Sequence, residues 1–197
     1  MPEPFLYPDR PHIRRHGPVY TAYESYRPWL RDEFSFRCVY CLKREQWGIV
    51  RGTFDIDHFV PQQIASGRVT DYDNLVYSCA SCNAAKRSLL LPDPTQFLVY
   101  PSVIVHPDGS MDGHSAEAKE IIGSLDLDGP AYREFRRLWI DIIALARNYD
   151  IDLYRELLGF PTTIPNLVAK RPRKNSRREG VGQSFHAQLK RGDPPLA

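Results

Sequence analysis

The chain has 197 residues, of which 42% are hydrophobic and 12% aromatic, so it can bury the core of one ordinary domain and is too apolar for wholesale disorder. Its formal net charge of +2 does not by itself indicate nucleic-acid binding. The sequence has no apolar run long enough for a membrane helix and no secretory signal at its N-terminus, so we expect a cytoplasmic protein with no membrane segment.

The N-terminal part predicts an arm followed by one packing helix. Residues 1–18 are rich in proline and arginine and indicate an extended arm. Residues 19–34 predict a helix, with Pro28 as a point where it breaks or restarts. The aromatic side chains that recur there with helical spacing are Tyr20, Tyr23, Tyr26 and Trp29. We favour packing against the core over an aromatic ligand site.

All four cysteines occur in two C-x-x-C pairs, CVYC at residues 38–41 and CASC at residues 79–82. In a reducing compartment this usage indicates metal binding rather than disulfides. Each pair can place two thiolates on one side of a tight turn, and two pairs complete the tetrahedral sulfur shell that zinc prefers. We therefore predict one structural zinc ion bound by Cys38, Cys41, Cys79 and Cys82. Two alternatives are four cysteines that pack as small apolar side chains and a redox-active pair.

Polar residues are concentrated between and just after the two cysteine pairs. DIDHFVP at residues 55–61 has the apolar alternation of a strand but carries two carboxylates and an imidazole. DNLVY follows at residues 73–77, and Asn83 comes directly after Cys82. If one zinc ion joins the two pairs, it also brings Asp57 and His58 near Asn83. A closed four-thiolate site performs no chemistry, so any reaction must use these other residues.

At residues 36–90 the chain resembles the HNH endonucleases of the ββα-metal type, in their four-cysteine form. The resemblance rests on CVYC, DIDHFVP, DNLVY and CASCNAAKRS, and DIDHFVPQ is similar to the matching stretch of the HNH domain in RNA-guided CRISPR nucleases. The third position of the HNH motif is Asn83 instead of histidine, and the glycine pair often found after the first motif is reduced to Ser66 and Gly67.

The resemblance implies a β-hairpin that supplies Asp57 and His58 and a following helix that supplies Asn83. The chemistry of these side chains suits phosphodiester hydrolysis. A histidine can deprotonate water near neutral pH, and a hard divalent ion held by carboxylate and amide oxygens can bind phosphate. We therefore expect His58 as the general base, and Asp57 and Asn83 as ligands of one catalytic Mg²⁺ or Mn²⁺ ion.

Four neighbouring residues are weaker candidates. Asn74 is expected to support the loop and the orientation of the histidine, or to be a turn residue only. Lys86 and Arg87, one helical turn after Asn83, suit phosphate contacts or are simply solvated charges. Asp55 shares a strand face with Asp57 but has no assigned role.

The remainder of the chain predicts mainly helices. LVYPSVIV at residues 98–105 indicates an edge strand, because it contains proline, and HPDGSMDG indicates a turn. Residues 115–125 predict a helix with Ser115 as its N-cap, and residues 151–158 a further short helix. The clearest helix is expected at residues 131–148, where an apolar stripe is formed by Phe135, Leu138, Trp139, Ile142, Leu145 and Ala146.

The C-terminal segment is basic and polar, and we expect little fixed structure from Arg171 to Ala197. Between Lys170 and Arg178 it has basic residues and no acidic one, and this run either contacts DNA phosphates or has no role: Lys170, Arg171, Arg173, Lys174, Arg177 and Arg178.

The predicted fold is α+β. It has a ββα-metal core (HNH, or His-Me finger) held by a four-cysteine zinc site, an N-terminal helix and a helical C-terminal extension. The expected organisation is an N-terminal arm and packing helix at 1–35, a nuclease domain at 36–91, a mainly helical accessory region at 92–165 and a basic tail at 166–197.

We therefore expect a metal-dependent DNA endonuclease, in phage defence or phage biology, acting as a homodimer or with a partner protein of a defence or restriction system. The alternative is a zinc-stabilised nucleic-acid-binding module without catalysis. That alternative explains the cysteines and the basic tail, but not the joint placement of Asp57, His58 and Asn83. A thiol redox protein would explain only the cysteine pairs. Sequence specificity and the choice between nicking and double-strand cleavage are not encoded in any motif that we recognise.

Overall fold

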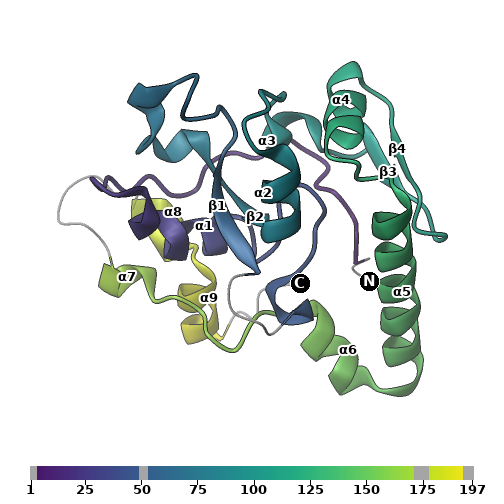
Figure 1. Cartoon of the computed structure of the whole chain (residues 1–197). Helices are drawn as coiled ribbons and strands as arrows, with labels where there is room; N and C mark the ends of the chain where they lie inside the picture. Colours follow the sequence, from purple (N-terminus) through teal and green to yellow (C-terminus); the bar gives the residue numbers. More distant parts are fainter. Residues whose placement is uncertain (1–3, 49–52, 171–177, 193–197) are drawn as a thin grey trace.

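The computed structural model describes residues 4–48, 53–170 and 178–192, and these form an α+β fold (Figure 1). Two small antiparallel hairpins, β1–β2 and β3–β4, are surrounded by helices. The elements in chain order are η1 Tyr23–Tyr26, α1 Arg27–Glu33, η2 Glu45–Trp47, β1 Phe54–His58, η3 Ser66–Arg68, η4 Tyr72–Asn74, β2 Leu75–Cys79, α2 Ala80–Lys86, α3 Pro94–Phe97, β3 Val103–Val105, β4 Met111–Gly113, α4 Ala116–Ser124, α5 Pro130–Tyr149, α6 Ile151–Leu158, α7 Leu167–Lys170, α8 Arg178–Gly182 and α9 Phe185–Arg191.

The unit β1–β2–α2 lies at the centre of the molecule and confirms the predicted ββα arrangement. In the hairpin, Asp55 lies opposite Ser78 and Asp57 opposite Val76. Every residue of β2 is buried, as are four of the five residues of β1. The chain passes from β2 into α2 with Cys79 as the N-cap, so the second cysteine pair spans the junction between strand and helix.

The described part of the N-terminal arm, residues 4–18, is extended as predicted, but it contacts the core at several points. Phe5 and Tyr7 are buried, and the Arg14 guanidinium donates to the carbonyl of Leu75 at 2.6 Å. The following helix is shorter than expected, because residues 20–22 are not helical. Pro28 lies in the first turn of α1, where its missing N–H is not required for a helical hydrogen bond.

The accessory region has the predicted helices, with one difference in which face is buried. The Ser115 hydroxyl accepts from the Ala118 amide and caps α4, as expected. On α5, however, Leu138 and Leu145 are 50% and 57% exposed. The buried face carries Arg136 instead, whose guanidinium donates to the carbonyls of Gly109 and Leu127. Phe135, Trp139 and Ala146 of the predicted stripe do pack on the hydrophobic core, so the buried face is rotated about the helix axis and contains only part of the predicted stripe.

The C-terminal segment is more ordered than the sequence predicts. Residues 178–192 form α8 and α9, and the ring of Phe185 packs against Phe160 and Phe36 at centroid separations of 4.4 and 5.6 Å. The Phe185 amide also donates to the buried carboxylate of Asp32 at 2.9 Å. The expectation of little fixed structure is therefore wrong for these residues, because one aromatic anchor and one buried acceptor bind them. Most of the basic run lies outside the described residues.

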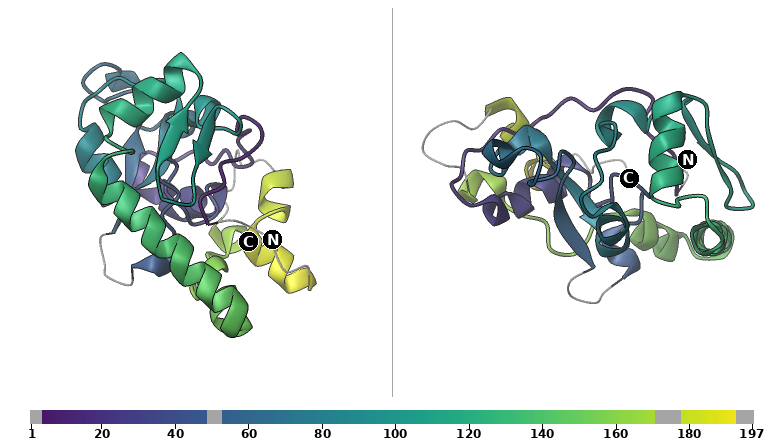
Figure 2. Two further views of the ribbon diagram at one scale, coloured as in Figure 1. Left: turned by 90° about the vertical axis from the view of Figure 1, so that its right-hand side faces the viewer. Right: turned by 45° about the horizontal axis from the view of Figure 1, so that its top comes forward.

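Figure 2 shows α5 along one side of the molecule and α8 and α9 on another, with the β1–β2 hairpin between them. A single hydrophobic core extends from Phe5 to Val181 and includes the zinc-ligand cysteines. The four-part division of the chain stays a prediction. Among the described residues, no helix combines the length and apolar character needed to cross a membrane.

Candidate active site and metal centre

The four cysteines form one buried cluster that can hold a metal ion. Their sulfur atoms all lie within 4.8 Å of one another, with Cys41 and Cys79 3.7 Å apart. Cys38 and Cys41 come from a tight turn closed by the bond from the Leu42 amide to the Cys38 carbonyl. Hydrogen bonds from the neighbouring thiols lower the pKa of Cys79, and a thiolate is the form that binds metal. Four sulfur ligands around one point fit a structural zinc ion, as predicted.

Asp57 is buried on β1 beneath helix α2, and both of its carboxylate oxygens have partners. The Tyr40 hydroxyl donates to Oδ2 at 2.6 Å, and the Lys86 ammonium donates to Oδ1 at 3.1 Å. Lys86 is itself fully buried and also donates to the carbonyl of His58 at 2.8 Å. The expected phosphate contact by Lys86 does not agree with this position. Its charge is neutralised internally, next to a predicted metal ligand.

The imidazole of His58 has a hydrogen-bond partner at each of its ring nitrogens. Its Nε2 lies 2.9 Å from the carbonyl oxygen of Val69, and because a carbonyl only accepts, Nε2 is assigned the proton. Nδ1 is then the basic nitrogen, and the amide of Gln62 donates to it at 3.1 Å. The ring of Tyr23 lies edge-to-face against the imidazole at 5.0 Å. This is the tautomer that a general base acting through Nδ1 requires.

Asn83 and Asp55 interact across the contact between α2 and β1. The Asn83 side-chain nitrogen donates to Oδ2 of Asp55 at 3.3 Å. With the nitrogen turned to Asp55, the carbonyl oxygen of the amide lies on the other side and can serve as a metal ligand. Asp55, which had no assigned role, thus contacts a predicted metal ligand. Asn83 and Lys86 lie one helical turn apart on α2. Asn83 contacts Asp55 and Lys86 contacts Asp57, the next carboxylate along the strand.

Asn74 is fully buried and closes the loop that follows His58. Its side-chain oxygen accepts from the Val60 amide at 3.0 Å, and its nitrogen donates to the Val60 carbonyl at 3.1 Å. Its own carbonyl accepts from the Phe59 amide at 3.2 Å. These contacts agree with the predicted role of Asn74 in supporting the loop. None of them involves the imidazole of His58.

A polar cavity of about 270 Å³ lies next to the predicted base and metal ligands. Its lining includes Asp57, His58 and Asn83, with Gln62 and the exposed Arg87 also on the wall. Each carboxylate oxygen of Asp57 accepts one hydrogen bond and has a second acceptor position. One carboxylate and one amide oxygen fit a hard ion such as Mg²⁺ or Mn²⁺.

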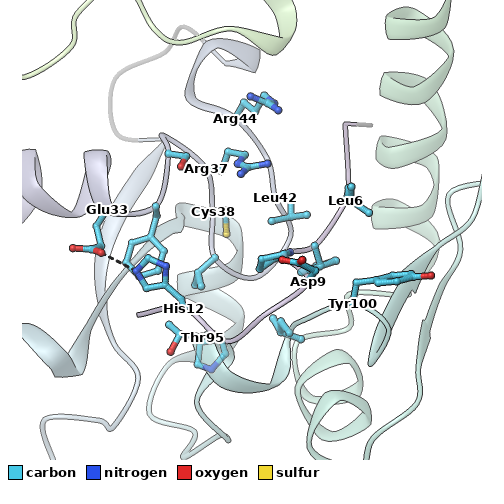
Figure 3. Close-up of a pocket in the computed structure, with 17 residues that line it drawn as sticks. Leu6, Asp9, His12, Glu33, Arg37, Cys38, Leu42, Arg44, Thr95 and Tyr100 are labelled. Carbon is cyan, nitrogen blue, oxygen red and sulfur yellow. Dashed lines mark hydrogen bonds and ion pairs between the residues drawn. The ribbon is translucent and has the colours of Figure 1, made fainter. Parts of the chain in front are cut away.

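A larger cavity lies elsewhere, between the N-terminal arm and the first cysteine pair (Figure 3). It measures about 690 Å³, and Cys38 is the one predicted site residue on its wall. Size does not decide which cavity is catalytic, because a nucleic-acid duplex is too large to be enclosed by either. The smaller cavity contains the base and the oxygen ligands, so we identify it as the candidate active site.

Sequence reasoning missed three residues that shape this site. Tyr40 lies inside CVYC and Gln62 directly follows DIDHFVP, so both were within quoted motifs. Tyr23 was interpreted only as a packing residue. Nothing in the local sequence indicates that Tyr40 and Tyr23 meet Asp57 and His58, because these pairs are 17 and 35 positions apart and meet only in the folded chain.

The comparisons with known proteins agree with this geometry. Residues 38–89 match the sequence profile of the HNH endonucleases. No curated protein matches the chain. The matched segment contains both cysteine pairs, the β1–β2 hairpin and α2. Residues 38–89 therefore match an HNH endonuclease domain, and this segment contains a four-cysteine cluster that can hold a metal ion.

Proposed function

We propose that the protein is a metal-dependent endonuclease that hydrolyses phosphodiester bonds in DNA. The observation that carries the proposal is the orientation of His58. Its Nε2 donates to the Val69 carbonyl, which leaves Nδ1 as the basic nitrogen, and His58 lines a cavity together with Asp57 and Asn83. A base and two oxygen ligands on one small cavity are what metal-assisted hydrolysis of a phosphodiester needs.

Each side chain has a stated part in this mechanism. Nδ1 of His58 takes a proton from the attacking water, and the Val69 carbonyl keeps the imidazole in the reactive tautomer and stabilises the imidazolium that forms. Asp57 and Asn83 would hold the divalent ion, which when bound would neutralise charge on the phosphate and polarise its oxygens. Asp55 orients the Asn83 amide, and the exposed Arg87 on the rim can contact a phosphate. The Gln62 amide must yield its place at Nδ1 to the water.

The alternative function, a zinc-stabilised nucleic-acid-binding module without catalysis, is favoured by one specific contact. The ammonium of Lys86 already neutralises the Asp57 carboxylate. An internal cation at this position competes electrostatically with a divalent ion, and a site of this kind could have lost its metal. The two functions share the zinc cluster, so zinc content does not distinguish them.

Plasmid nicking distinguishes them. We expect the wild-type protein to cleave with Mg²⁺ or Mn²⁺, and His58→Ala to lose at least a hundredfold in rate while its zinc content and DNA affinity stay unchanged, because general-base catalysis contributes about that much. Gln63→Ala, a change on the wall of the same cavity, is the matched control. DNA binding without cleavage by the wild type would establish the binding module. Cleavage that survives His58→Ala would exclude His58 as the base.

We propose a cytoplasmic enzyme of phage defence or phage biology, acting as a homodimer or with a partner protein. Cleavage of both DNA strands requires two active sites or two sequential nicks. Analytical ultracentrifugation with and without a DNA duplex tests whether the protein forms a homodimer. A dimer would have twice the mass of the monomer.

A further inference from the structure

Helix α5 of the accessory region reaches the four-cysteine cluster, although it lies outside the matched segment 38–89. Tyr132 and Phe135, near the start of this helix, line a cavity of about 260 Å³. Cys41 and Cys79 lie on the wall of the same cavity. The cluster is therefore in contact with a part of the chain that the family match does not include.

Tyr132 makes the direct contact with a cysteine. Its hydroxyl oxygen lies 3.3 Å from Sγ of Cys82. Without a metal, either atom could donate the hydrogen bond. Cysteine binds zinc as a thiolate, which has no proton, so in the zinc-bound protein the hydroxyl is the donor. A hydrogen bond to an ionised acceptor is about twice as strong as one between neutral groups.

The charge of a zinc-loaded cluster explains why such a donor matters. A zinc ion with four thiolates carries a net negative charge. Cys38 and Cys82 are fully buried, and Cys41 and Cys79 are only 2% exposed, so water has little access to them. Buried charge is costly unless hydrogen bonds compensate it. The Tyr132 hydroxyl supplies one such bond to the thiolate of Cys82.

We propose that Tyr132 is a positioning residue for the zinc ion: its hydroxyl holds the Cys82 thiolate in place and slows the release of the metal. The accessory region then determines how firmly the nuclease domain keeps its zinc. Groups that hydrogen-bond to metal ligands typically change metal affinity by about 10- to 100-fold. This role depends on the cysteine cluster, which the nuclease and the binding module share, so it is independent of the nuclease chemistry.

The aromatic ring of Tyr132 has a separate role in packing. It is partly buried and packs against the hydrophobic core. Loss of the whole side chain would therefore disturb the core as well as the cluster. Tyr132→Phe removes the hydroxyl and keeps the ring, so it isolates the hydrogen bond to Cys82.

Transfer of zinc from the full-length protein to a chromogenic chelator tests the proposal. We expect Tyr132→Phe to release zinc about tenfold faster than the wild type, because it removes a group that holds a metal ligand. Tyr149→Phe, at an 85% exposed tyrosine of the same helix, is the matched control and should release zinc at the wild-type rate. Thermal melting of the zinc-loaded proteins verifies that all three are folded.

Replacing zinc by Co²⁺ gives a second, spectroscopic measurement. Removing a hydrogen bond from a thiolate raises the energy of its sulfur lone pairs, so the thiolate-to-cobalt charge-transfer absorption of Tyr132→Phe should move to longer wavelength. It should stay unchanged in Tyr149→Phe. A wild-type rate of zinc release in Tyr132→Phe would overturn the proposal. So would faster release with an unshifted absorption, because Tyr132 would then act through packing alone. Neither measurement requires nicking activity, so a protein that does not cleave DNA leaves the test intact.

Discussion

Lys86 places a positive charge in contact with Asp57, the carboxylate that the proposed mechanism needs for its divalent ion. At the scale of single residues this is the contact that most affects function. The lysine forms an ion pair with the carboxylate and anchors α2 to the carbonyl of His58, so it fixes the strand and helix that carry the site. It also reduces the attraction between Asp57 and any second cation.

Replacing Lys86 by methionine tests which of these effects is larger. We expect the free energy of unfolding to fall by about 3 kcal/mol, since the change leaves a buried carboxylate without its cation. Urea denaturation measures this loss. Mg²⁺ should restore more stability to the variant than to the wild type, because binding to the folded state alone is stabilising. Lys119→Met, at an exposed lysine of α4, is the control. If stability were unchanged and DNA binding were weakened, the result would support the phosphate contact by Lys86 that the sequence predicted.

A second residue-scale effect concerns Glu33, which joins the N-terminal arm to α1. Burial tends to raise the pKa of Glu33, but the hydrogen bond from His12, the charge of His16 and the Arg15 amide lower it to about 2. The folded-state pKa is thus below the usual value of 4.5. The stability from this group is therefore present above about pH 4.5 and is lost as the pH falls toward 2.

Glu33→Gln should remove this pH dependence. The wild type is expected to lose roughly 3 kcal/mol more than the variant between pH 5 and pH 2, as the pKa difference requires. Urea denaturation at several pH values measures it. Release of zinc at low pH affects both proteins, so the difference between them is the relevant quantity. Glu156→Gln, at an exposed position on α6, should titrate like the wild type, and identical profiles for Glu33→Gln and wild type would contradict the assigned contacts.

At the scale of elements, the C-terminal helix α9 is part of the folded body rather than a tail. Phe185 fills the space between Phe36 and Phe160, and the Arg15 guanidinium lies over its ring at 5.3 Å. The backbone amide of Phe185, at the start of α9, also donates a hydrogen bond to the buried carboxylate of Asp32. The arm, α1 and α9 therefore meet at one place, although α9 lies more than 150 positions after the other two in the sequence.

Phe185→Ala should cost about 3 kcal/mol of unfolding free energy, the usual loss for truncating a buried phenylalanine. Leu189→Ala on the same helix, at a 47% exposed position, should cost much less. Urea denaturation of the two variants gives the comparison, and limited proteolysis should release the C-terminal segment faster from Phe185→Ala. Equal and small effects would mean that α9 is not docked in solution.

At the scale of the whole molecule, the four-cysteine cluster joins segments that lie far apart in the chain. The first pair precedes β1 and the second spans the junction of β2 and α2, so a bound ion closes the unit that carries Asp57, His58 and Asn83. The cluster is also part of the single core and contacts the accessory region, since the Tyr132 hydroxyl lies 3.3 Å from the sulfur of Cys82.

Removing the metal should therefore unfold the protein rather than merely inactivate it. We expect about one zinc ion per chain, and loss of near-ultraviolet circular dichroism and of cooperative melting in Cys79→Ser/Cys82→Ser or after chelation. Elemental analysis and thermal melting measure the two quantities. Ser81→Ala, within the second pair, is the control. A protein that stays cooperatively folded without zinc, or that forms disulfides under mild oxidation, would favour the redox alternative.

The sequence by itself predicted the cysteine cluster from local spacing, and its resemblance to the HNH endonucleases supplied the ββα unit and the active-site candidates. C-x-x-C turns, the alternation in DIDHFVP and the position of Asn83 after Cys82 specify geometry over a few residues. The helix at residues 151–158 and the cap at Ser115 were confirmed for the same reason.

Only the tertiary structure decided which charges meet. Lys86 and Arg87 are neighbours in the sequence, but one is buried against Asp57 and the other is exposed, because the docking angle of α2 selects a single face. The rotated face of α5, the docking of α9 and the contact of Tyr132 with Cys82 likewise depend on segments distant in the chain. Periodicity shows that a helix has a buried face. Which side chains lie on that face depends on the surface against which the helix packs, and no local pattern encodes that surface.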